Sequence, residues 1–267
     1  MEILSIQYII LGALQGITEL LPISSSAHLA LLPWFFTWQD PGLSSTIALH
    51  MGTLLAILLY FRQDWFSMAR AFITGLQNRD FLQRDSRIFL CIIFATIPGA
   101  LIGFFLQDYA ETLFRSPLLI AGALIVFSGV IFFAEKFGKR VVSMHDVSLW
   151  PVFFIGLLQA CAIIPGVSRS GATIAGGLYF GLKRPDAARF SFLLSAPIIF
   201  GAGLVTLPGI LERGIAPSFV AGLLATFVVG YATISFLMRF IQNHSFYPFV
   251  WYRLALAMLI IAVWLVR

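Results

Sequence analysis

The sequence predicts an all-α polytopic membrane protein with an inverted-topology repeat, in which each half is a re-entrant helical hairpin followed by three transmembrane helices. Three observations lead to this prediction: the composition, the lengths of the apolar segments and a similarity between the two halves. Of the 267 residues, 60% are hydrophobic and only 11% are charged, whereas soluble domains carry about 25% charged residues. So few charges cannot cover a water-soluble surface, so we expect a membrane protein.

Six apolar segments are long enough to cross a lipid bilayer. A helix needs about 17–25 apolar residues to cross a hydrocarbon core of about 30 Å. The connection between the first two segments, Arg62–Arg87, is rich in arginine and is expected to be a loop. The six segments are Ser45–Phe61, Ile88–Leu106, Pro117–Ala134, Phe190–Leu211, Pro217–Met238 and Phe249–Val266.

Two further apolar regions, Ile3–Trp38 and Trp150–Leu182, are each interrupted by a polar break. The first break is Glu-Leu-Leu-Pro-Ile-Ser-Ser-Ser at 19–26, and the second is Pro-Gly-Val-Ser-Arg-Ser-Gly at 165–171. About a dozen apolar residues follow each break, which is too few to span a bilayer but suits a re-entrant segment. Each region is therefore predicted to form a helical hairpin.

The two hairpins align with each other when the sequence is shifted by 144 residues. Five identities are weak on their own, because segments rich in Leu, Gly and Ser match easily. However, three spans follow each hairpin, and an odd number of crossings inverts the second copy. The sequence thus predicts one membrane domain, 1–267, with an internal repeat of 1–147 and 148–267. The aligned pairs are Gly12 with Gly156, Leu14 with Leu158, Gln15 with Gln159, Ser24 with Ser168 and Ser26 with Ser170.

The distribution of basic residues favours this arrangement over eight full spans. With two hairpins, twelve basic residues of loops and termini share one side and three lie on the other, whereas eight full spans give ten and five. The stronger bias agrees better with the positive-inside rule and places both termini outside the cytoplasm. The twelve are Arg62, Arg70, Arg79, Arg84, Arg87, Lys136, Lys139, Arg140, Lys183, Arg184, Arg189 and Arg239; the three are Arg115, Arg213 and Arg267.

Five ionisable residues lie inside the apolar regions, where charge is costly enough to suggest function. Arg253 begins the last span, where we expect its side chain to reach the membrane interface as a structural residue. His50 lies in mid-span and is interpreted as a hydrogen-bonded packing residue. Glu19, His28 and Arg169 instead lie at or beside the hairpin breaks, together with the hydroxyl groups of Ser24, Ser25, Ser26, Ser168, Ser170 and Thr173.

The two breaks predict an anion-binding site. A helix begins after each break, with Ser24–Ser26 and Ser168–Ser170 as N-caps, and a helix N-terminus offers free N–H groups and partial positive charge. If the inverted halves bring the breaks together, both N-termini converge with Arg169, whose planar guanidinium group matches phosphate oxygens. The expected ligand is phosphate or pyrophosphate. In the alternative, the serines only cap helices and Arg169 neutralises Glu19 as a buried ion pair.

The residues of the first break also predict catalysis. Gln15 and Glu19 are four residues apart and share a helix face, and His28 follows Ser24 by four residues, which brings it close to Ser25. An imidazole beside a hydroxyl group permits nucleophilic attack or proton transfer, while Glu19 can bind a divalent cation or act as a base. These groups are the components that phosphoryl transfer requires.

Two long motifs connect the chain to a known family. The first is Gln15–Glu19, which continues as Leu-Leu-Pro-Ile-Ser-Ser-Ser-Ala-His through His28, and the second is Pro165–Thr173. Together they resemble the undecaprenyl pyrophosphate phosphatases of the bacitracin-resistance type. The resemblance extends over nearly the whole chain, including Phe190–Leu194 and Pro248–Arg253.

The resemblance implies hydrolysis of undecaprenyl pyrophosphate to undecaprenyl phosphate and inorganic phosphate, which supplies carrier lipid for cell-wall synthesis and confers bacitracin tolerance. It also implies a bacterial inner-membrane location, a site open to the periplasm and a divalent cation, magnesium or calcium. By motif position, the expected catalytic residues are Glu19, Ser25, His28 and Arg169, with Glu19 also the metal ligand. The expected substrate contacts are Gln15, Ser24, Ser26, Ser168, Ser170 and Thr173.

One departure from the family pattern bears on the metal. Gln15 stands where many members carry Glu, so the first motif holds one carboxylate, and the diphosphate would supply the remaining cation ligands. The residues leave open whether Ser25 or His28 is the nucleophile.

The alternative function is a transporter or flippase for a polyprenyl phosphate or a small organic anion, because inverted repeats and broken helices are also features of transporters. His28 close to Ser25 favours the enzyme, since a carrier needs no nucleophile. The expected partners are a polyprenyl diphosphate and membrane lipid. Nucleic acid is not expected, because no cluster of Lys and Arg exceeds three in a short stretch. The sequence leaves monomer and homodimer open.

Overall fold

The computed structural model describes residues 2–36, 38, 42–81, 83–213 and 216–266. This part of the chain consists of helices joined by turns and loops, with one isolated β-bridge. The described residues include three short 3₁₀ helices: η1 (Leu113–Arg115), η2 (Met144–Asp146) and η3 (Cys161–Ile163). The α-helices are α1 (Glu2–Thr18), α2 (Ser25–Phe36), α3 (Gly42–Tyr60), α4 (Arg62–Asn78), α5 (Arg84–Glu111), α6 (Pro117–Phe137), α7 (Leu149–Ala160), α8 (Arg169–Tyr179), α9 (Arg184–Arg213), α10 (Pro217–Asn243) and α11 (Tyr247–Val266).

Each of the six predicted spans is a helix. By length and hydropathy, α5, α6, α9, α10 and α11 qualify as membrane spans, and α3 qualifies together with α4 as a bent pair. The described residues thus contain five or six candidate spans, which confirms a multi-pass all-helical membrane protein.

The expectation of a loop at Arg62–Arg87 is wrong. Residues Arg62–Asn78 form α4, which meets α3 at an angle of 75°, and α5 begins at Arg84. Small and apolar residues recur at helical spacing among the arginines and pack α4 against α5, as expected for an amphipathic helix. The buried residues of α4 are Met68, Ala71 and Gly75.

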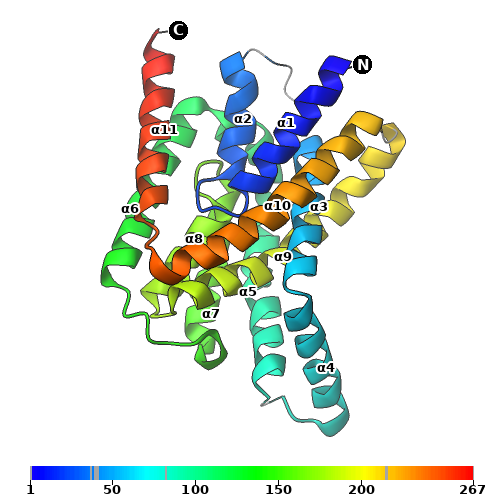
Figure 1. The fold of residues 1–267 in the computed structure, drawn as a ribbon, viewed down its shortest axis with the longest axis vertical. Helices are drawn as coiled ribbons and strands as arrows, with labels where there is room; N and C mark the ends of the chain where they lie inside the picture. Colours follow the sequence, from blue (N-terminus) through cyan, green and yellow to red (C-terminus); the bar gives the residue numbers. More distant parts are fainter. Residues whose placement is uncertain (1, 37, 39–41, 82, 214–215, 267) are drawn as a thin grey trace.

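The two broken regions form helical hairpins. The first consists of α1 and α2, and the second of α7, η3 and α8. Because α2 and α8 contain 12 and 11 residues, each is too short to cross a bilayer. In Figure 1, the first hairpin enters from the end where both termini lie, and the second enters from the opposite end, where α4 lies.

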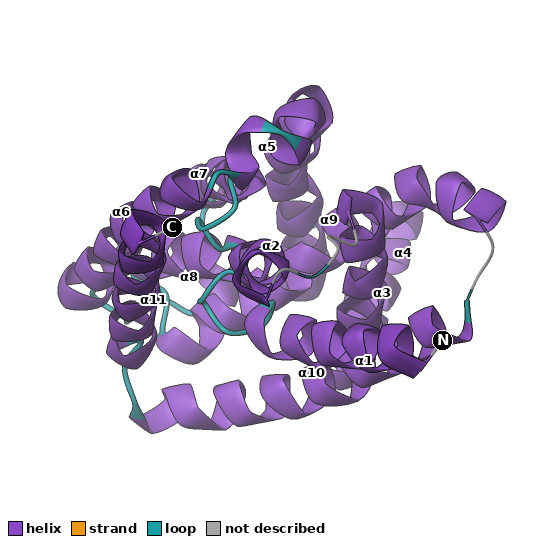
Figure 2. Cartoon of the chain, turned by 90° about the horizontal axis from the view of Figure 1, so that it is seen from above, coloured by secondary structure: helices purple, strands orange, loops and turns teal. Residues whose placement is uncertain are grey.

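The longer helices surround these hairpins. Helix α1 packs along α10, α7 along α5, α6 against α11, and α3 against α9 and α10. Figure 2 shows α2 near the centre of the molecule, with α6 and α11 on one side and α3 on the other. This packing places the polar breaks in the interior.

Candidate functional site

In each break, the residue just before the new helix is a serine with an unusual backbone conformation. Ser24 has a φ of 75° and Ser168 a φ of 70°, in the left-handed region that residues other than glycine rarely adopt. The Ser24 Oγ accepts from the Ala27 N–H at 3.4 Å, and the Ser168 Oγ accepts from the Gly171 N–H at 3.1 Å. Both serines therefore act as N-caps, as predicted.

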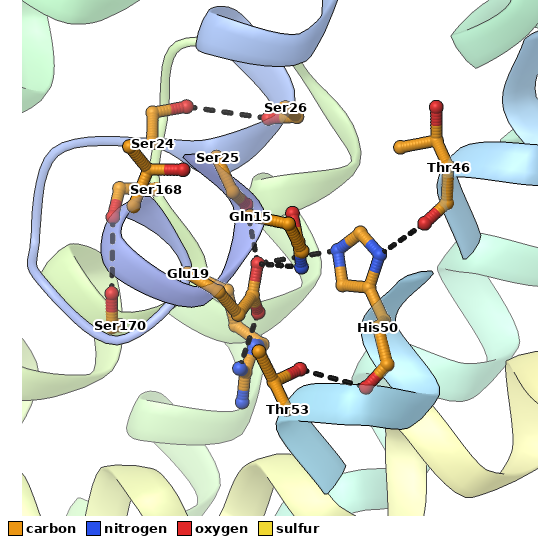
Figure 3. A network of polar contacts seen from close by, with 12 residues as sticks. Gln15, Glu19, Ser24, Ser25, Ser26, Thr46, His50, Thr53, Ser168 and Ser170 are labelled. Carbon is orange, nitrogen blue, oxygen red and sulfur yellow. Dashed lines mark hydrogen bonds and ion pairs between the residues drawn. The ribbon is translucent and has the colours of Figure 1, made fainter. Parts of the chain in front are cut away.

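Hydrogen bonds join the two breaks. The Gly166 N–H donates to the Ser24 Oγ at 3.0 Å, and the Ser170 hydroxyl donates to the Leu21 carbonyl oxygen at 3.1 Å. The Ser26 Oγ lies 3.2 Å from the Ser24 Oγ. The breaks, 142 or more residues apart in the chain, thus form one polar unit, as predicted (Figure 3).

Arg253 binds backbone carbonyl groups of both breaks. The expectation that its side chain reaches the membrane interface is wrong, because Arg253 is fully buried. Its guanidinium group meets carbonyl groups that the broken helices leave without helical partners, and five N–H donors suit it to that role. It donates to the carbonyl oxygens of Pro22, Gly166 and Val167 at 3.2, 2.9 and 3.1 Å and to the Ser128 hydroxyl at 3.1 Å.

The carboxylate of Glu19 is the centre of the site. Its Oε1 accepts from Arg169 Nη2 at 2.6 Å. Its Oε2 accepts from the Ser25 hydroxyl, from Gln15 Nε2 at 3.3 Å and from His50 Nε2 at 3.2 Å. Only 5% of the Glu19 side chain is exposed, so four donors replace water around a buried charge (Figure 3).

Two buried polar atoms at this centre have no hydrogen-bond partner among the described residues: Arg169 Nη1, a donor, and Gln15 Oε1, an acceptor. Buried polar atoms are seldom left unpaired, so both are suited to contact a ligand. The Glu19–Arg169 ion pair of the alternative hypothesis is present, but it occupies only one terminal nitrogen of the guanidinium group.

The hydrogen bonds of His28 go to groups other than the Glu19 carboxylate. Its Nδ1 donates to the Ser24 carbonyl oxygen at 2.7 Å, and its Nε2 lies 2.7 Å from the Tyr252 hydroxyl, with the two rings stacked. The expectation that His28 approaches Ser25 is not met by any hydrogen bond among the described residues. Both imidazole nitrogens are already engaged, one by the backbone and one by α11.

His50 is hydrogen-bonded, as interpreted, and one of its two contacts is the Glu19 carboxylate, at 3.2 Å from Nε2 to Oε2. The signal was present in the sequence, because His50 is ionisable and lies in the middle of a span. The sequence does not show which side chain His50 faces, because that depends on how α3 packs against the first hairpin.

Thr173 is buried in the base of the second break. Its hydroxyl group donates to the Arg169 carbonyl oxygen at 2.9 Å and lies 2.6 Å from the Ser191 Oγ. These contacts tie the first turn of α8 to α9, so that Thr173 supports the backbone of Arg169.

The donors around Glu19 limit how a metal ion can bind. Among the described residues, no three His, Cys, Asp or Glu side chains lie close enough together to hold a metal ion. One lone pair of Glu19 Oε1 and the unpartnered Gln15 Oε1 remain as acceptors. This set fits a cation only if the cation brings most of its oxygen ligands with it.

The fold and the site define a polytopic membrane protein whose two broken hairpins meet around a buried carboxylate, an arginine and several serine hydroxyls. The chain belongs to the family described as "Bacitracin resistance protein BacA", which matches residues 8–259. The resemblance inferred from the two motifs is therefore confirmed.

Relatives cover almost the entire chain. The "Undecaprenyl-diphosphatase" of Desulforudis audaxviator is 46% identical over 263 residues, which cover 97% of each chain. The protein of the same name from Moorella thermoacetica is 46% identical over 263 residues, 98% of each chain. That of Pelotomaculum thermopropionicum is 44% identical over 257 residues, 96% of each chain.

Proposed function

We propose that this protein hydrolyses undecaprenyl diphosphate to undecaprenyl phosphate and inorganic phosphate. Relatives named for this activity are 46% identical over 97% of the chain, and the family is described by bacitracin resistance. The observation that carries the proposal is the hydrogen bond from the Ser25 hydroxyl to the buried Glu19 carboxylate. A nucleophile paired with a base is what an enzyme requires and a carrier does not.

In the proposed reaction, Ser25 is the nucleophile and Glu19 the general base. The Ser25 Oγ forms a bond to the terminal phosphorus, its proton passes to Glu19, and the anhydride P–O bond breaks to release undecaprenyl phosphate. Water then attacks the phosphorus of the phosphoserine, and the P–O bond to Ser25 breaks. The proton on Glu19 returns to the serine oxygen, and both protons of the water leave with the product as dihydrogen phosphate. Ser25 is favoured over His28 because the base contacts Ser25 directly.

Arg169 and the two breaks are proposed to bind the phosphoryl group. The unpartnered Arg169 Nη1 offers a buried donor beside Ser25's base, and Ser168 and Ser170 hold the start of the helix that carries it. Stabilising the charge on the phosphoryl oxygens is a large part of catalysis in phosphoryl transfer.

We also propose that a divalent cation, magnesium or calcium, binds together with the diphosphate, held on the protein side by Glu19 and Gln15. When bound, the cation neutralises negative charge on the diphosphate. Because the protein supplies few ligands, a chelator should stop phosphate release, and either added cation should restore it. Full activity in chelator, measured as phosphate release, would remove the metal from the proposal.

The activity is tested by phosphate release from a polyprenyl diphosphate by the detergent-solubilised protein. No membrane separates two compartments in detergent, so transport cannot be mistaken for hydrolysis. The enzyme should release one phosphate for each diphosphate consumed. A well-folded protein that binds the lipid without releasing phosphate would favour the transporter or flippase.

Phosphoenzyme trapping distinguishes the two nucleophile candidates. Acid quenching during turnover should trap an acid-stable phosphoserine at Ser25, and Ser25→Ala should abolish both the adduct and turnover. His28→Ala should slow turnover and still form the Ser25 adduct. Ser235→Ala, at an exposed hydroxyl on α10, is the matched control. An acid-labile adduct on His28 would assign the nucleophile to His28 instead.

We further propose that residues 1–147 and 148–267 form an inverted repeat within a single membrane domain. The two N-cap serines with positive φ are 144 residues apart, the same shift that aligns the sequence. The hydroxyl pairs that follow also correspond, because Ser168 and Ser170 lie 3.3 Å apart and their first-half counterparts 3.2 Å apart.

Helix packing supports the same repeat. Helix α1 approaches α10 at Gly12, where an added Cβ would lie 2.1 Å from the Gly222 carbonyl oxygen. Helix α7 approaches α5 at Gly156, the aligned glycine, where a Cβ would lie 2.6 Å from the Ala95 carbonyl oxygen. The same close approach is used twice, by hairpins that enter from opposite ends (Figure 1).

The proposed orientation in the bacterial inner membrane places both termini and the site opening on the periplasmic side, with α4 in the cytoplasm. In a background without native cysteines, Gln77→Cys on exposed α4 should resist a membrane-impermeant thiol reagent in intact cells. Glu212→Cys, at the opposite end, should react. Labelling of position 77 but not of position 212 from outside would show that the protein has the opposite orientation.

A further inference from the structure

We propose that His50 is a positioning residue of the phosphatase reaction, which holds the Glu19 carboxylate on Ser25 and away from the second nitrogen of Arg169. This inference rests on the proposed function. It concerns a histidine outside both sequence motifs, on a separate helix.

The imidazole ring of His50 is fixed at both ends. Its Nδ1 donates to the Thr46 carbonyl oxygen at 2.8 Å, within α3, which sets the ring orientation. Its Nε2 lies 3.2 Å from Glu19 Oε2, the same oxygen that accepts from Ser25. Both ring nitrogens therefore face oxygen atoms, and the ring is placed to donate to Thr46 and to Glu19. His50 thus adds a donor from α3 to an oxygen otherwise held only by residues of the first hairpin.

Arg169 competes for this same oxygen. A guanidinium group prefers to bind a carboxylate with two parallel hydrogen bonds, yet here only Nη2 contacts Glu19, through Oε1, and Nη1 is buried without a partner. A rotation of the carboxylate would bring Oε2 onto Arg169 and complete the bidentate pair. That pair would remove the acceptor from Ser25 and occupy the nitrogen proposed for phosphate.

His50 opposes this rotation. Among the described residues, the donors on Oε2 are Ser25, Gln15 and His50, and of these only His50 lies outside the hairpin that carries Glu19. Without its N–H, the remaining donors are a serine that must give up its proton during the reaction and an amide at 3.3 Å. The inactive bidentate pair would then be favoured.

Three substitutions test this inference. His50→Gln keeps an N–H that reaches Glu19, whereas His50→Asn is too short to reach it, and His50→Leu has no donor and suits an apolar helix. We expect kcat/KM for phosphate release to fall about 10- to 100-fold in the Asn and Leu variants, and to remain within about fivefold of wild type in the Gln variant. Melting temperatures should stay close to wild type in all three.

Rescue by Gln is the result that a purely structural role would not produce. Wild-type kcat/KM in a well-folded Asn or Leu variant would overturn the inference, and so would an equal loss in all three variants. If either the Asn or the Leu variant folds poorly, the kinetics of the other variant test the inference. Absence of phosphate release by the wild-type protein would instead overturn the proposed function, so the two failures are distinguishable.

Discussion

Replacing Glu19 with glutamine is expected to lower kcat for phosphate release by about 100- to 10,000-fold, the contribution typical of a general base. The substitution preserves size but removes the acceptor of the Ser25 proton and the negative partner of Arg169. It also replaces the charged carboxylate proposed as a cation ligand with a neutral amide, which brings no negative charge to the cation. Added magnesium or calcium should therefore not restore turnover.

The matched control is Glu212→Gln, an exposed carboxylate on α9, which should leave kcat and thermal stability unchanged. Kinetics over a range of cation concentrations, measured beside melting temperature, separate a chemical defect from a folding defect. Near-normal turnover of Glu19→Gln with unchanged metal dependence would remove Glu19 from the catalytic machinery.

Most of the fold follows from local sequence, because the bilayer imposes simple rules. A span must be about 20 residues long and apolar, so segments such as Pro117–Ala134 are recognisable from composition, and α6 covers that segment with three more residues at its end. Helix α4 was not predicted, because the arginines between its apolar positions make the segment resemble a polar loop. One of these apolar positions, Met68, is buried against the rest of the protein.

The site is predictable to the extent that it is local. Glu19 and Ser25 lie within seven residues, and a helix break between them brings them together. Arg169 required the two breaks to meet, which the internal similarity suggested. His50 and Arg253 depend on the rotation of long helices about their axes, and in an almost wholly apolar span the sequence does not indicate which neighbour a polar side chain faces.

Substitution of Arg169 tests the proposal that its guanidinium group binds the phosphoryl group. Arg169→Lys keeps a positive charge for Glu19 but cannot also supply the second donor that Nη1 offers, because an ammonium group lacks the planar fork. The loss of one charge-assisted hydrogen bond costs about 1.5–3 kcal/mol, which corresponds to a roughly 10- to 100-fold lower kcat/KM. Arg169→Ala should lower it further, because it leaves the anion without a partner in a low-dielectric site and Glu19 without its counter-charge.

If Arg169 only neutralises Glu19, we expect other results for these two variants. Arg169→Lys would then have wild-type kinetics, since the lysine still pairs with Glu19, and Arg169→Ala would mainly lower folding yield and melting temperature because it leaves a buried charge unpaired. Arg70→Lys, at an exposed position on α4, controls for the general effect of exchanging the two cations. Because one nitrogen of Arg169 already binds Glu19 and the other is buried without a partner, we expect the loss to appear in kcat/KM of well-folded Arg169→Lys.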